Sequence, residues 1–221
     1  MNYLQLAQRL HAESLRSTAA PTTVTGASDR NLRLFTLLAD KWRNLQTERD
    51  WRWMRAQLNA VVTIGLQTYT GAALGATRFG RWRIEDGQYE PVMYRSASPS
   101  AYWALGYWDV DSFRREYIYR SLGKTTPIAW SYDENDQLLI GPAPAEAYQL
   151  RIDYWKSPSE LVLDADTPDM PDRFHMVLVW EALIDIATSD AAPEILANAQ
   201  RNLSMLRQGL IFDQARLPFV V

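Results

Sequence analysis

The chain has 221 residues, and 47% of them are hydrophobic, which is enough apolar side chain for a folded core and excludes a largely disordered protein. The formal net charge is −3 with both signs mixed along the chain, so the bulk charge does not indicate binding to nucleic acid. Cysteine is absent, which excludes disulfides, zinc sites built on thiolates and a cysteine nucleophile.

The N-terminal segment is expected to form two helices joined by a loop. Apolar residues recur at helical spacing over residues 3–16 and again over Asp29–Glu48, with Ser28 as the candidate cap of the second helix. Between them, TAAPTTVTGAS is small, polar and broken by a proline and a glycine. Because neither a signal peptide nor a membrane-spanning apolar run is present, we expect a soluble protein without an export signal of its own.

The middle of the chain has the composition of strands. Short stretches rich in β-branched and aromatic residues alternate with glycines, prolines and polar turns, which predicts an antiparallel β unit. The expected strands are 58–64, 66–70, 81–85, 89–95, 128–132, 137–140 and 147–155. One short helix is expected within 109–120, with Asp109 or Asp111 as its cap and Gly123 as its stop.

Two further helices are expected after the acidic loop 164–172, whose prolines prevent a strand. Between Met176 and Ala187 only Glu181 and Asp185 are polar, so this helix is apolar around most of its circumference. Such a helix belongs inside a bundle or at a subunit boundary. The last helix begins at Pro193 and has one apolar face.

This order of elements predicts an α+β fold, in which N- and C-terminal helices form a bundle and a sandwich-like or barrel-like antiparallel β unit is inserted between them. The expected parts are the N-terminal helices (1–55), the inserted β unit (56–163), the C-terminal helices (164–216) and an extended tail (217–221).

Motifs for catalysis or cofactor binding are weak. Gly123-Lys124-Thr125 is similar to the end of a phosphate loop, but Ile118 stands where the first glycine belongs, and a strand follows instead of a helix. The two histidines, His11 and His175, are isolated, so packing or capping is favoured over metal binding.

The acidic loop has four aspartates whose spacing does not match a calcium loop, so turns and a helix cap are the favoured interpretation of Asp164, Asp166, Asp169 and Asp172. The separation of two carboxylates for glycoside hydrolysis is set by the fold and cannot be read from the sequence. The G-x-S-x-G nucleophile elbow is absent. We therefore expect neither enzymatic activity nor a cofactor.

Several stretches in a fixed order resemble the head-to-tail adaptor, or connector, family of tailed bacteriophages. They are MNYLQLAQRL, PTTVTG, LQTERDWRWMR, GKTTPIAW, GPAPAEAYQLRIDYWKSP and TPDMPDRFHMVLVWEAL. The resemblance covers essentially the whole chain and depends on order and spacing, because none of these stretches is a catalytic signature.

The resemblance implies a structural virion protein that lies in the neck of the particle and is assembled in the host cytoplasm. It implies a dodecameric ring of identical chains, bound beneath the portal protein and connected to the next neck or tail component. In this arrangement DNA passes through the ring without recognition of its sequence, and no membrane is involved.

Two sets of residues are candidates for these contacts. In related adaptors a C-terminal extension packs against the portal, and the matching positions are Leu217, Pro218, Phe219, Val220 and Val221. An extended apolar segment of this kind binds a partner or packs back onto its own helices. Candidates for the channel lining or the subunit interface, with a solvated helix face as their alternative role, are Arg30, Arg33, Arg43, Arg49, Arg52 and Arg55.

The aromatic content supports a different interpretation. Nine Trp, eleven Tyr and six Phe either fill the core of a β domain or mark a partner surface, because Tyr and Trp combine apolar area with a hydrogen-bonding tip. The alternative function is therefore a β-sandwich carbohydrate-binding or recognition module, in which exposed rings stack on sugars. A hydrolase of the virion is a third hypothesis and depends only on carboxylates that the sequence cannot place.

Overall fold

The computed structural model describes most of the chain, namely residues 1–14, 19–84, 90–120 and 122–214, except for the side chain of Asp29. Helices form both ends and strands the middle, so the predicted α+β class is confirmed. Among these residues, no helix is both long and apolar enough to cross a membrane.

Contacts divide the chain into two units. The helical unit is Met1–Met54 together with Pro158–Val221, and the β unit is Arg55–Ser157. The described part of the helical unit has four long helices, α1 (Tyr3–Glu13), α2 (Asp29–Glu48), α4 (Met176–Ser189) and α5 (Pro193–Gln214). It also has two single turns of 3-10 helix, η1 (Arg52–Met54) and η3 (Asp172–Phe174).

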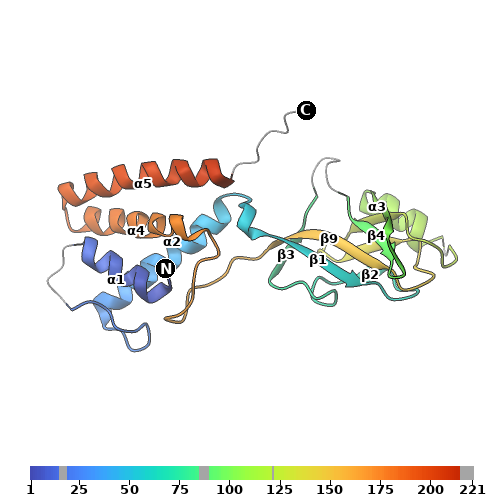
Figure 1. Cartoon of the computed structure of the whole chain (residues 1–221), viewed down its shortest axis with the longest axis horizontal. Helices are drawn as coiled ribbons and strands as arrows, with labels where there is room; N and C mark the ends of the chain where they lie inside the picture. The colour runs from blue at the N-terminus through green and yellow to red at the C-terminus, as the bar shows by residue number, and fades with distance from the viewer. Residues whose placement is uncertain (15–18, 85–89, 121, 215–221) are drawn as a thin grey trace. The chain divides into compact units, whose positions relative to one another are not determined.

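Helix α4 is the centre of the helical unit. It packs against α1, α2 and α5, and Figure 1 shows α5 lying along it. Its buried side chains are Val177, Leu178, Val179, Trp180, Ala182, Leu183, Ile186 and Ala187. A helix that is apolar on nearly every side can only be accommodated where other helices surround it. The expectation of a buried helix is therefore confirmed.

Polar side chains fix how α2 meets its neighbours. The indole Nε1 of buried Trp42 donates to the Ser159 hydroxyl at 3.1 Å. The amide of Gln46 bonds the backbone of Ser159 twice, with its Nε2 donating to the carbonyl at 2.9 Å and its Oε1 accepting from the N–H at 2.8 Å. These bonds satisfy buried polar groups and so attach the segment after the β unit to α2.

The acidic loop is a set of hydrogen-bonded turns. The Asp164 carboxylate accepts from the Val24 N–H at 2.6 Å and from the Thr23 hydroxyl at 3.0 Å. The Asp166 carboxylate accepts from the N–H groups of Val162 and Leu163, each at 2.7 Å. The turn interpretation of these two aspartates is confirmed.

The β unit has nine strands in its described part, β1 (Arg55–Val61), β2 (Thr68–Tyr69), β3 (Phe79–Trp82), β4 (Val92–Arg95), β5 (Ser98–Ala104), β6 (Gly106–Tyr107), β7 (Ala129–Tyr132), β8 (Leu138–Gly141) and β9 (Gln149–Lys156). A five-stranded sheet has the order β1-β9-β4-β5, with β3 also paired to β9. A four-stranded sheet has the order β2-β8-β7-β6. All pairs are antiparallel except β6 with β7.

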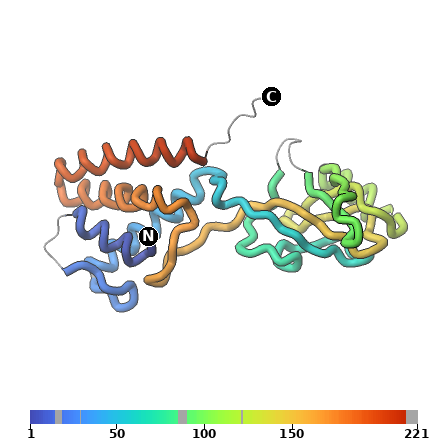
Figure 2. The backbone as a smooth tube through the Cα atoms, viewed as in Figure 1, coloured from blue at the N-terminus to red at the C-terminus, as the bar shows by residue number. Residues whose placement is uncertain are grey.

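Strands β1 and β9 open and close the β unit and lie side by side, as Figure 2 shows. Their register pairs Arg55 with Trp155 and Val61 with Gln149. Alternate residues of both strands, among them Leu58 and Ile152, point into one apolar core that also contains Trp130 and other side chains of the four-stranded sheet. The two sheets thus share a core in a sandwich-like arrangement.

The two unexpected strands and the end of the short helix differ from the sequence predictions, whereas the cap of that helix is one of the two predicted residues. Strands β5 and β6 were not expected, because their exposed residues lack the alternation of a half-buried strand. The short helix is α3 (Val110–Phe113) continued by a π turn, η2 (Arg114–Ile118), so it ends before Gly123. The cap is Asp109, whose carboxylate accepts from the N–H groups of Asp111 and Ser112.

Candidate functional site

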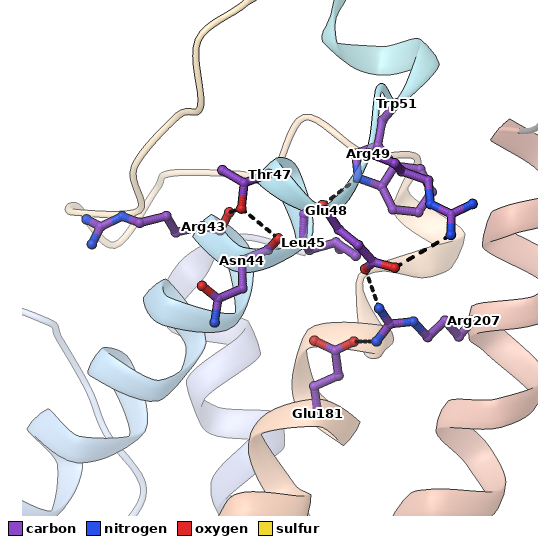
Figure 3. Close-up of polar contacts among 9 residues, drawn as sticks. All are labelled: Arg43, Asn44, Leu45, Thr47, Glu48, Arg49, Trp51, Glu181 and Arg207. Carbon is purple, nitrogen blue, oxygen red and sulfur yellow. Dashed lines mark hydrogen bonds and ion pairs between the residues drawn. The ribbon is translucent and has the colours of Figure 1, made fainter.

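The two polar positions of α4 meet cations from the neighbouring helices. The Arg207 guanidinium on α5 donates through Nη1 to the Glu181 carboxylate and through Nη2 to Glu48 on α2, as Figure 3 shows. One turn along α4, the Asp185 carboxylate lies 2.7 Å from Nζ of Lys41 on α2. Three helices are thereby joined by ion pairs along one stripe.

These charges line a hollow of about 490 Å³. Its other lining residues are Asn44, Leu45, Ile184 and Leu203. Three carboxylates and two cations give the lining a net charge of −1, which disfavours the binding of an anion.

Glu181 is the buried carboxylate of the network. Only 11% of its side chain is exposed, and burial raises the pKa of its carboxyl, although the charges of Arg207 and Lys41 act in the opposite direction. Burial favours the neutral acid, whereas the guanidinium favours the carboxylate. Arg207 already binds this carboxylate and thereby links α5 to α4.

The six arginines that the sequence singled out are all exposed, but they do not form one cluster. Arg49 lies 3.6 Å from the carboxylate of Glu48 and places its guanidinium 5.1 Å from the ring centroid of Trp51, so it extends the network of Figure 3. Arg43 is 3.2 Å from Glu160, and Arg33 donates to the Ser189 hydroxyl at 3.0 Å.

The remaining three arginines are more dispersed. Arg30 lies in the first turn of α2 and Arg52 in η1, both in the helical unit. Arg55 opens β1, and its Nε is 3.8 Å from the carboxylate of Asp153 in the β unit. The candidate tail, Leu217 to Val221, lies outside the described residues.

The sequence pattern identified Glu181 and Asp185 but not their partners. Two acids four residues apart on an otherwise apolar helix require cations or water. Arg207 is 26 residues from Glu181, and only the packing of α5 on α4 brings the two together. The two acids on an apolar helix could therefore have indicated that cations lie nearby. The sequence alone does not show which residues supply those cations.

The helical unit held by ion pairs and the aromatic β unit describe the fold, and comparison with known proteins gives the class, a phage adaptor protein. The chain belongs to the SU10 adaptor protein family, whose sequence profile matches residues 1–218. This membership confirms the adaptor resemblance and makes the chain a structural component of a virion. A comparison with curated proteins found no match.

Proposed function

We propose that this adaptor forms a ring beneath the portal, in the neck of the particle, and connects the capsid to the tail. The observation that carries the proposal is the family match over residues 1–218, because it includes both the helical and the β unit. Identical chains that meet through two different surfaces form a ring when the rotation between neighbours closes, and the family resemblance gives twelve copies. DNA then passes through the ring without contacts that read its sequence.

The C-terminal segment is proposed as the attachment to the portal. It follows α5, whose C-terminal half exposes Met205 and Phe212, with Phe212 at 79% exposure. Burial of Phe219 and its valine neighbours on a partner contributes about 1.5 to 3 kcal/mol for each side chain before ordering costs. The ring multiplies this contribution through avidity.

Deletion of residues 217–221 tests this attachment. The truncated chain is expected to keep the circular dichroism spectrum of the intact protein and to lose co-purification with portal. Binding to portal at the intact level, or loss of the folded spectrum, would show that the tail belongs to its own unit instead.

The exposed arginines of the helical unit are proposed to face the channel or a neighbouring subunit. Arg30 is the clearest test, because it is exposed and near the start of α2. Reversal of charge at Arg30, Arg33 and Arg43 is expected to reduce ring assembly or DNA retention, measured by electron microscopy of particles and by packaged DNA. Unchanged assembly together with unchanged DNA retention would assign these residues to a solvated helix face.

A further inference from the structure

Two tyrosines lie next to each other on the outer face of the five-stranded sheet. Tyr94 of β4 and Tyr102 of β5 are paired across the two strands, and Tyr94 is also paired with Gln149 of β9. Because Met93 is buried in the core, its neighbour Tyr94 points to the opposite, outer side of the sheet. Tyr102 is 67% exposed on an edge strand, so its ring is accessible from solvent.

Polar groups of different chemistry surround these rings. The tyrosines line a hollow of about 310 Å³ together with Gln57, Glu90 and Arg151, and Val92 and Pro99 supply its apolar remainder. This volume is at the lower end of the range for small-molecule sites, about 300 to 1,000 Å³.

The arginine of this hollow is held in place by its neighbours. Arg151 Nε donates to the Asn59 side-chain oxygen at 3.1 Å, and the guanidinium carbon lies 5.9 Å from the ring centroid of Tyr94. Because the bond to Asn59 uses Nε, the two terminal nitrogens can donate to a ligand. A side chain fixed by backbone register and by a second residue is preorganised for binding.

The lining favours a neutral ligand that has many hydroxyl groups. The charges of Arg151 and Glu90 cancel, whereas a site for single-stranded nucleic acid requires an excess of cations beside its aromatic rings. Guanidinium, carboxylate and amide groups each offer two polar atoms in one plane, which suits neighbouring hydroxyls. The C–H face of a sugar ring packs on an aromatic side chain, which supplies the apolar part of the contact.

We propose that Tyr94, Tyr102, Gln57, Glu90 and Arg151 form a saccharide-binding site on the outer face of the β unit, with room for about one or two sugar rings. The tyrosines are the stacking platform, and the three polar side chains bind the hydroxyls. This site goes beyond the connecting role proposed above and does not depend on it, since every residue involved lies in Arg55–Ser157.

Saturation-transfer NMR on the full chain tests the site with three neutral probes: maltotetraose, cellotetraose and chitotetraose. At least one of them is expected to bind with a Kd of about 1 mM, because the site is shallow. Tyr102→Ala is expected to weaken that binding about tenfold, because it removes half of the platform. Tyr102→Phe keeps the ring and is expected to retain most of the affinity.

Tyr119→Ala is the matched control, because Tyr119 is 75% exposed in the same unit but does not line the hollow. It is expected to bind the sugar as the unchanged protein does. If circular dichroism shows that Tyr102→Ala does not fold, Tyr94→Ala is the alternative variant, because it removes the other ring of the platform. Raising the salt from about 50 to about 500 mM is expected to leave sugar binding unchanged, because no net charge is involved.

Several results would overturn the proposal. They are failure of all three sugars to bind, equal binding by Tyr102→Ala, or binding of deca-thymidine or a proline-rich peptide in place of sugar. Ring formation and portal attachment are measured separately, so failure here leaves the connecting role untouched, and the reverse also holds.

Discussion

The two units use polar side chains in different ways. In the helical unit, charged residues lie between helices. Arg207 binds both Glu181 and Glu48, and Lys41 binds Asp185. In the β unit, the core is filled by aromatic and aliphatic side chains, and its ion pairs include Arg114–Glu134 on the surface and the largely buried pair Arg83–Asp153 at 3.0 Å. Backbone ladders already fix the register of strands, whereas apolar helices can slide past one another. Between helices, ion pairs can therefore contribute to a register that strands obtain from their ladder.

The largest effect is expected from the core of the β unit. Trp130→Ala should lower the free energy of unfolding by about 3 to 5 kcal/mol, because it removes a fully buried indole and leaves a cavity. Denaturant titration measures this change. Trp130→Phe is the control and should cost much less, since Nε1 of Trp130 has no hydrogen-bond partner within the described structure. Equal losses for the two variants would mean that packing does not dominate this core.

A smaller effect is expected from the ion pairs of the helical unit. Arg207→Met should cost about 2 kcal/mol, because it leaves the carboxylate of Glu181 buried without its cation. The double variant Glu181→Leu with Arg207→Met should regain most of that stability, since it removes both charges. The loss in the single variant should also shrink in acid, because the raised pKa of Glu181 lets it protonate early. A double variant as unstable as the single one would contradict this account.

The buried His175 should make the helical unit sensitive to acid. Its Nε2 lies 3.0 Å from the Met170 carbonyl oxygen, and burial lowers its pKa, although Asp172 acts to raise it. The unfolded state therefore binds a proton first as the pH falls through about 6.5. The free energy of unfolding should decrease from that pH down to the lowered pKa of the folded state. His175→Gln should flatten this part of the profile, and an identical profile would assign the acid sensitivity elsewhere.

The smallest effect is expected from the surface of the β unit. Arg114 binds both carboxylate oxygens of Glu134 at 2.7 Å and lowers the pKa of Glu134 to about 2. Glu134 is exposed and Arg114 is partly exposed, so water and salt screen the pair. Arg114→Ala should hardly change the melting temperature at neutral pH. The ion pair stabilises the fold above the ordinary pKa of glutamate, and this contribution is lost as the pH falls toward about 2. The melting temperature of the variant, which lacks the pair, should therefore fall less steeply in that range. A large loss at neutral pH would remove the contrast between the units.

The sequence predicted the bounds of an element best where its apolar residues recur with one regular period. The bounds of α2 coincide with the prediction Asp29–Glu48, because its apolar stripe is regular and no breaker interrupts it. Helix α4 was identified from its composition alone. In contrast, β5 (SPSAYWA) contains a proline and small residues and is mostly exposed, so it has no alternation to detect.

The sites depended on contacts that no local pattern contains. The pairing of Tyr94 with Tyr102 follows from the register of β4 on β5, which also contains an irregularity between Tyr94 and Arg95. Likewise, the contact between Glu181 and Arg207 follows from helix packing. Sequence reasoning supplied the two acidic positions of α4 and the excess of aromatic rings, and tertiary structure supplied which residues meet.

The pairing of β1 with β9 also bears on how such a chain can change during evolution. Arg55 and Trp155 are cross-strand partners, so the points where the chain enters and leaves the β unit are about 5 Å apart. A gap of that size can be closed by a short turn or filled by another module whose own ends lie close together. The helical unit can thus serve as a constant host for exchangeable inserts, and relatives can vary what they carry there without rebuilding the helices.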